Sequence, residues 1–241
     1  MDERNSYKRG MVVVAHPDDA EFGCSGTIAK WCRQGMEVVQ VICTDGSKGS
    51  SDPMMTPQSL QEIRYREQQA AARVLGVKEV VFLGHEDSML QPTLELRRDI
   101  AREIRRHRPQ VVICQPPVRN LFGNGHIGHP DHIAAGEATL SAVFPAARDR
   151  LTFPELLEEG LEPHKVREVL ISDREHADAW IDVTDYLDVA IEALRQHKSQ
   201  LGSWNVADGM RKWRARTGES KDMTYAEAFK SFKYQVDEEV E

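Results

Sequence analysis

The chain has 241 residues, of which 40% are hydrophobic and 29% charged, a balance typical of one compact domain. Lys and Arg number 31 against 39 Asp and Glu, so the net charge of -8 argues against nucleic acid or an anionic membrane as the main partner. The longest apolar run near the start, residues 11–15, is too short for a signal-peptide core or a membrane span. We therefore expect a cytoplasmic protein with a small-molecule substrate, and the four cysteines are not spaced as a disulfide framework.

Short runs rich in Val and Ile alternate with amphipathic stretches, which predicts a mostly parallel sheet flanked by helices. The expected strands are residues 11–15, 37–44, 79–84, 110–115, 167–172 and 179–183. The first four are continuous apolar runs, as in strands that are buried on both faces. The predicted fold class is therefore α/β, with a Rossmann-like sheet.

Capping signals mark the ends of several helices. Thr56-Pro57 predicts the start of a helix that ends before Gly76. Other helices are expected near residue 26, over about 94–107, from Pro130 onward and over about 185–201.

The composition changes after Gly202, where the chain becomes charged and aromatic. We predict a main α/β domain over residues 1–202 and a helical C-terminal appendage over 203–241, which packs on the body or on a neighbouring subunit. Tyr225, Phe229 and Phe232 are spaced i, i+4, i+7, which favours a short helix within that appendage.

One histidine and three carboxylates directly follow the first predicted strand, as His16, Asp18, Asp19 and Glu21. Ligands of open α/β sheets bind at the carboxyl ends of the strands. The alternative is an acidic, solvated loop that caps the next helix.

A second cluster follows the fourth predicted strand and contains His126, His129, Asp131 and His132. Histidine and carboxylate ligands suit zinc or a similar divalent metal, and three protein ligands with an open position are typical of a catalytic site. The alternative is a helix start, with Pro130 in the first turn and Asp131 at the positive end of the helix dipole. Because both clusters lie at strand ends, we expect a metal centre.

Two motifs in this order, A-H-P-D-D-A-E at 15–21 and H-P-D-H at 129–132, resemble those of the LmbE-like, or PIG-L, family of zinc-dependent de-N-acetylases. Further matching segments lie at 44–46, 64–67, 82–87 and 191–200. The resemblance covers residues 11 to about 200.

The resemblance implies a metal site and its catalytic groups. The implied ligands of Zn²⁺, or of Fe²⁺ in the cell, are His16, Asp19 and His132. Asp18 matches the general base that faces the metal-bound water. His129 matches the histidine that stabilises the oxyanion, in its imidazolium form, and Asp131 matches the carboxylate that orients this histidine.

The resemblance also implies substrate contacts, at Arg64 and Asp87, and we add Glu21 as a substrate contact or a partner of the metal ligands. The alternative for Arg64 is a structural ion pair with Glu67. His197 is expected to be a partly buried histidine at a helix end.

The function that follows is removal of the N-acetyl group from an N-acetylglucosamine-type conjugate by a homo-oligomeric enzyme. The alternatives are an amidase that cleaves a larger acyl group from a thiol or sugar conjugate, and a catalytically silent sugar-binding protein. A dinucleotide-binding oxidoreductase is disfavoured, because no G-x-G-x-x-G follows the first strand. Ser47-Lys48-Gly49 and the long segment at 118–128 depart from the family pattern and leave the substrate open.

Overall fold

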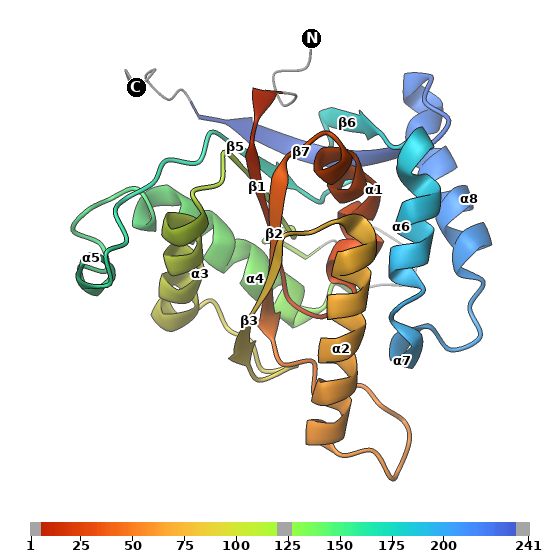
Figure 1. The fold of residues 1–241 in the computed structure, drawn as a ribbon, viewed down its shortest axis with the longest axis horizontal. Helices are drawn as coiled ribbons and strands as arrows, with labels where there is room; N and C mark the ends of the chain where they lie inside the picture. The colour runs from red at the N-terminus through yellow and green to blue at the C-terminus, as the bar shows by residue number, and fades with distance from the viewer. Residues whose placement is uncertain (1–5, 120–126, 235–241) are drawn as a thin grey trace.

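The computed structural model describes residues 6–119 and 127–234, and these residues form a sheet of seven strands in the order β3-β2-β1-β4-β5-β7-β6 (Figure 1). The strands are β1 Arg9–Val14, β2 Glu37–Thr44, β3 Glu79–His85, β4 Val111–Cys114, β5 Glu168–Ile171, β6 Ala179–Asp182 and β7 Ala226–Lys233. The first five strands of this order, from β3 to β5, pair in parallel. The predicted α/β class with a mostly parallel sheet is confirmed.

Helices cover both faces of the sheet (Figure 1). They are α1 Asp19–Arg33, α2 Pro57–Leu75, α3 Leu94–His107, α4 Pro130–Ser141, α5 Glu155–Glu158, α6 Leu187–Leu194, α7 Lys198–Leu201 and α8 Val206–Gly218, with single turns at Ala142–Ala146, Thr184–Tyr186 and Glu219–Lys221. No helix within the described ranges has the length and apolar character needed to cross a membrane. All four cysteines are free, as expected.

The alternation of side chains along β1 produces two cores. Met11 and Val13 pack in the cluster that contains residues of α3 and α4, whereas Val12 and Val14 pack with residues of α1 and α2. The strand is buried on both faces from Gly10 to Val14, which explains the continuous apolar run in the sequence.

The predicted caps of α2 are confirmed. The Thr56 hydroxyl accepts a hydrogen bond from the Ser59 N–H, and Pro57 occupies the first helical position. Gly76 ends the helix with φ of 85°, a conformation that glycine adopts without strain. The starts of α3 and α4 also match the sequence prediction.

The helix after β1 begins earlier than predicted, at Asp19 rather than near Gly26, and it bends at Cys24. The backbone N–H groups of Gly26 and Thr27 donate to the Glu227 carboxylate, at 3.0 and 2.8 Å, instead of continuing the helix ladder. The bend therefore depends on a side chain from β7, which local sequence signals do not reveal.

The helix predicted over 185–201 is interrupted, because α6 ends at Leu194 and α7 begins at Lys198. His197 lies between them with non-helical dihedral angles, φ −81° and ψ 55°, and it is fully buried. Its Nε2 lies 3.1 Å from a Glu21 carboxylate oxygen, so a tertiary contact accompanies the break.

The prediction of a helix containing Tyr225, Phe229 and Phe232 is wrong, because β7 occupies residues 226–233. β7 pairs antiparallel with both β5 and β6. Residues four apart share a face in a strand as well as in a helix, so the spacing of Tyr225 and Phe229 fits both structures. In β7, Phe229 is fully buried and packs in the same cluster as residues of α1. The helix of the C-terminal region is α8 instead.

Candidate metal centre

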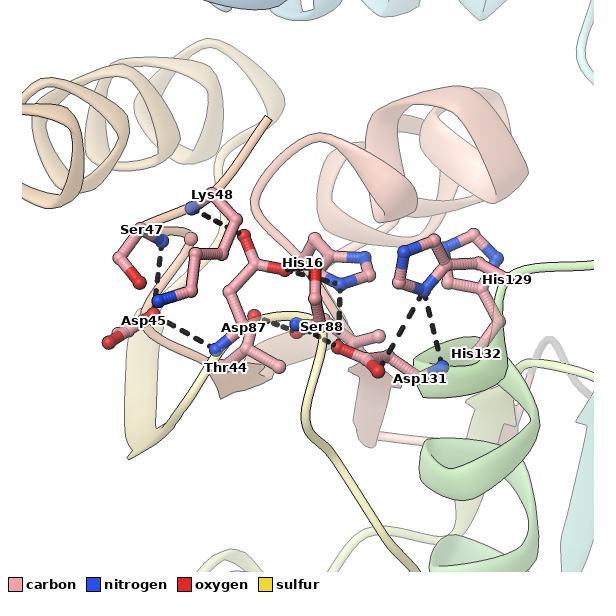
Figure 2. Close-up of polar contacts among 12 residues, drawn as sticks. His16, Thr44, Asp45, Ser47, Lys48, Asp87, Ser88, His129, Asp131 and His132 are labelled. Carbon is pink, nitrogen blue, oxygen red and sulfur yellow. Dashed lines mark hydrogen bonds and ion pairs between the residues drawn. The ribbon is translucent and has the colours of Figure 1, made fainter. Parts of the chain in front are cut away.

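The two predicted clusters meet at one edge of the sheet. β1 and β4 are parallel neighbours, with Val13 paired to Cys114, so the loops that follow them emerge side by side. The first loop leads into α1 with His16 and Asp19, and the second leads into α4 with His129 and His132. Figure 2 shows the three histidine rings of these loops gathered at the N-terminus of α4.

Asp19 lies between the two other predicted metal ligands, with Oδ2 close to His16 and Oδ1 close to His132. The Asp19 carboxylate oxygens lie 3.3 Å from His16 Nδ1 and 3.1 Å from His132 Nε2. Four ligands at about 2.0–2.1 Å from a tetrahedral ion are separated from each other by about 3.3 Å. Within residues 6–119 and 127–234, the groups whose ligand atoms all lie within 4.8 Å of one another are His16, His129 and His132, and His16, Asp87 and Asp131, so Asp19 is a member of neither. The donor types at this edge of the sheet, imidazole and carboxylate, suit a divalent cation of the zinc type.

Two buried carboxylates orient the His16 ring. Its Nε2 lies 3.1 Å from Asp131 Oδ2 and 3.2 Å from Asp87 Oδ1 (Figure 2). Asp131 Oδ2 also accepts the Ser88 N–H at 2.7 Å. A histidine that donates one ring N–H to a carboxylate presents the other nitrogen to a metal, so this arrangement directs Nδ1 toward Asp19.

The resemblance implied that Asp131 orients His129, but Asp131 lies closer to His16. His129 Nδ1 is 3.9 Å from Asp131 Oδ1 and instead accepts the Asp131 backbone N–H, at 3.2 Å. His129 thereby caps α4 with its own side chain. Asp131 Oδ1 is buried and has no hydrogen-bond partner among the described residues.

The charges of the site shift the pKa values of its groups. Burial opposes protonation of His16, but its hydrogen bonds with Asp19 and Asp87 raise its pKa to about 11. Burial opposes ionisation of Asp19, but His132 and His16 hold its pKa below the ordinary value. Burial and the nearby His16 lower the pKa of His129, although Asp131 acts in the opposite direction. The resemblance implied the imidazolium form of His129, whereas these surroundings shift its pKa downward.

Asp18, the predicted base, has an unusual backbone. Its φ of 94° is strained for a residue other than glycine, and such strain is concentrated at functional sites. Its N–H donates to Gln68 Oε1 at 3.0 Å, and its carbonyl accepts the Phe22 N–H at 2.9 Å. Burial, followed by the charges of Asp19 and Glu21, raises the pKa of the Asp18 carboxyl well above its ordinary value.

Glu21 lies in the interior, fully buried, and binds the side chains that position the loop. Its carboxylate accepts from Gln40 Nε2 at 3.0 Å and from Gln68 Nε2 at 3.1 Å, and it contacts His197. This burial favours the positioning role over the predicted substrate contact. Sequence reasoning missed both glutamines, although a Gln inside the apolar run of β2 was a signal of a buried polar partner.

Arg64 of α2 and Asp87, which follows β3, lie close together beyond His16. Arg64 Nη1 donates to the Gly46 carbonyl at 2.9 Å and lies 3.4 Å from Asp87 Oδ2, while its buried Nε has no partner in the described part of the chain. The ion pair of Arg64 with Glu67 is not formed, because Glu67 accepts from the N–H and hydroxyl of Ser199. His126, from the second cluster, lies outside the described residues.

A cavity of about 290 Å³ adjoins the site on its other side and is lined by Asp19 and His132. Part of its wall comes from α8, through Trp213 and Thr217. No sequence signal indicated that residues beyond 202 line a cavity next to Asp19 and His132.

Comparison with known proteins identifies similar sequences and structures. Residues 11–143 match the family model described as PIG-L, GlcNAc-PI de-N-acetylase. A diacetylchitobiose deacetylase of Thermococcus kodakarensis is 33% identical over 81% of this chain and 71% of its own. A mycothiol S-conjugate amidase of Streptomyces coelicolor is 31% identical over 61% of this chain and 55% of its own. The structure of the N,N'-diacetylchitobiose deacetylase of Pyrococcus horikoshii aligns with a TM-score of 0.89 at 27% identity, covering 97% of this chain and 86% of the other.

Proposed function

Because this chain belongs to the PIG-L family of GlcNAc-PI de-N-acetylases, we propose that it is a metal-dependent hydrolase that removes the N-acetyl group from an N-acetylglucosamine-type conjugate. Two similar proteins are named as deacetylases of diacetylchitobiose, an N-acetylated amino sugar. The observation that carries the proposal is the Asp19 carboxylate, which contacts His16 on one side and His132 on the other.

His16 Nδ1, the Asp19 carboxylate and His132 Nε2 would hold the metal. We propose Zn²⁺, with Fe²⁺ as the alternative, because imidazole and carboxylate ligands suit both ions. When bound, such an ion polarises an amide carbonyl and lowers the pKa of a coordinated water toward about 7. The Asp87 and Asp131 carboxylates would keep the His16 ring in the orientation that this requires.

Asp18 would act as the general acid and base. Its carboxylate takes a proton from the attacking water while the new C–O bond forms at the acetyl carbon. It then gives this proton to the nitrogen as the C–N bond breaks, so the products are acetate and a free amine. The strained backbone of Asp18, held by Gln68, supports a fixed position for this carboxylate.

His129 would donate a hydrogen bond to the developing oxyanion. Since its Nδ1 accepts the Asp131 N–H, a neutral ring carries its proton on Nε2 and can donate it without being an imidazolium. The ring is 39% exposed, so a substrate can reach it. On the other side of His16, Arg64 and Asp87 are placed to contact the sugar hydroxyls, whereas Glu21 positions the loop.

The test is release of free amine from N-acetylglucosamine and diacetylchitobiose by the zinc-loaded protein. Asp18→Asn should lower kcat by at least 100-fold, as expected for loss of a general base, while the bound zinc stays near the wild-type content. Asp52→Asn, at an exposed carboxylate outside the site, is the matched control. Turnover by Asp18→Asn close to wild type would contradict the assignment of the base. Bound zinc with no amine released from any conjugate would favour the silent sugar-binding protein.

A further inference from the structure

The cavity beside Asp19 and His132 is larger than an acetyl group requires. Its volume of about 290 Å³ exceeds several-fold the share of about 30 Å³ that one water molecule occupies in the liquid. An acetyl group places a single methyl carbon beyond its carbonyl. Space for several more heavy atoms therefore adjoins the predicted metal ligands.

The wall of this cavity is mostly apolar. Val14 and Ile113 contribute from the ends of β1 and β4, Phe22 from α1, and Trp213 from α8. Sugar hydroxyls are poorly accommodated against such a surface, because each loses hydrogen bonds to water on burial. An aliphatic chain has no hydrogen bonds to water to lose, and burial of its apolar surface is favoured by the hydrophobic effect.

Among the described residues, two arginines line the cavity: Arg174 is exposed, and Arg214 is buried and paired with a carboxylate. Arg214, 3% exposed, donates from Nη2 to the Phe22 carbonyl at 2.7 Å and lies 3.0 Å from Glu227 Oε1. Its charge is matched by the Glu227 carboxylate, which is equally buried, while the Arg214 Nε has no hydrogen-bond partner within the described ranges.

The polar groups and the cavity lie on opposite sides of the metal centre. Asp87, with Arg64, contacts the Nε2 side of His16, whereas the cavity begins at Asp19 and His132 and extends toward the ends of β4 and β5. A substrate amide at the metal carries the sugar on its nitrogen and the acyl chain on its carbonyl carbon. The sugar fits the polar side of the metal centre, and the acyl chain then extends into the apolar cavity.

We propose, on the basis of the proposed function, that this cavity is an acyl-binding pocket and that the enzyme hydrolyses amino sugars carrying linear N-acyl chains longer than acetyl, up to about six carbons. Water adds to the acyl carbon, the C–N bond breaks with the proton passing to nitrogen, and the products are a fatty acid and the free amino sugar. Acetyl is then the smallest of its substrates.

The first test is a series of N-acyl glucosamines, from acetyl through propionyl and butyryl to hexanoyl, with release of glucosamine measured by an amine assay. Each methylene that enters the pocket should raise kcat/KM by up to about fourfold, the equivalent of ~0.8 kcal/mol per buried CH₂. A tenfold or greater fall from acetyl to butyryl would overturn the proposal. Hydrolysis of acetyl alone would overturn it and leave the deacetylase in place, whereas hydrolysis of none would overturn both.

The second test narrows the pocket. Thr217→Leu and Ser172→Val place extra carbon atoms in its wall, and Ala215→Leu is a matched control at an exposed position of the same helix that is not part of the wall. The ratio of kcat/KM for hexanoyl over acetyl should fall at least tenfold in the first two variants and stay at the wild-type value in the control. Should Thr217→Leu not fold, Ser172→Val gives the same readout from the residue that follows β5. An unchanged ratio in the folded pocket variants would refute the acyl pocket.

Discussion

The link between Glu227 on β7 and the bend in α1 can be tested by removing one charge. Glu227 is 1% exposed, and its carboxylate accepts the N–H groups of Gly26 and Thr27 at 3.0 and 2.8 Å. The same carboxylate pairs with the buried Arg214 guanidinium. Glu227→Gln keeps the size of the side chain but removes its charge and turns one acceptor into a donor.

Two losses add up in this variant. Removing one member of a buried ion pair costs about 3–5 kcal/mol, because the remaining charge stays buried without compensation. One of the two N–H groups at the bend also faces an amide NH₂ instead of an oxygen. We expect the free energy of unfolding to fall by at least about 3 kcal/mol, and Tm to fall by at least about 6 °C at about 2–4 °C per kcal/mol for a domain of this size.

Urea titration followed by circular dichroism, together with scanning calorimetry, measures both quantities. Glu219→Gln, at an exposed carboxylate just after α8, is the control and should stay within about 0.5 kcal/mol of wild type. If Glu227→Gln also stays within that range, the ion pair does not stabilise the bend and the reasoning fails.

Three further predictions concern the metal and two close contacts. Zinc at 1,000 times its Kd should stabilise the fold by about 4 kcal/mol, and this shift should be absent from Asp19→Asn in the same thermal scan. Gly26→Ala would place a Cβ 2.7 Å from Val183 Cβ and should destabilise by about 1–3 kcal/mol; Val183→Ala in the same chain should recover part of this, and no recovery would argue against the clash. Gly136→Ala would bring its Cβ against the Gln115 carbonyl. This contact should displace α4 and weaken zinc binding, as measured by equilibrium dialysis. An unchanged zinc affinity would show that α4 does not set the position of His132.

Features fixed by neighbouring residues could be predicted from the sequence. Thr56, Pro57 and Gly76 delimit α2 through local hydrogen bonds and backbone preferences, and the apolar runs identified six of the seven strands of the described chain. The two motifs were found for a similar reason, since each directly follows a strand. Parallel strands that are neighbours in a sheet then bring His16 and His132 together without further information.

Features fixed by distant residues could not be predicted in this way. The bend of α1 depends on Glu227, and the strand β7 depends on pairing with both β5 and β6. The partner of Asp131 could not be predicted for the same reason, because its contact with His16 depends on how β1, β3 and α4 are placed relative to one another. The spacing of apolar residues indicates only the local period of the chain. Whether the segment forms a helix or a strand also depends on the elements that pack against it.

The C-terminal region therefore belongs to the construction of the site. β7 lies between β5 and β6, so a division of the chain at residue 202 would remove a strand from within the sheet. Glu227 of β7 and Arg214 of α8 both bond to α1 close to Asp19, through the Gly26 N–H and the Phe22 carbonyl. The same helix α8 supplies one wall of the cavity. Substitutions in this region should consequently change the choice of acyl group more than the metal chemistry, because they border the cavity without contributing a ligand.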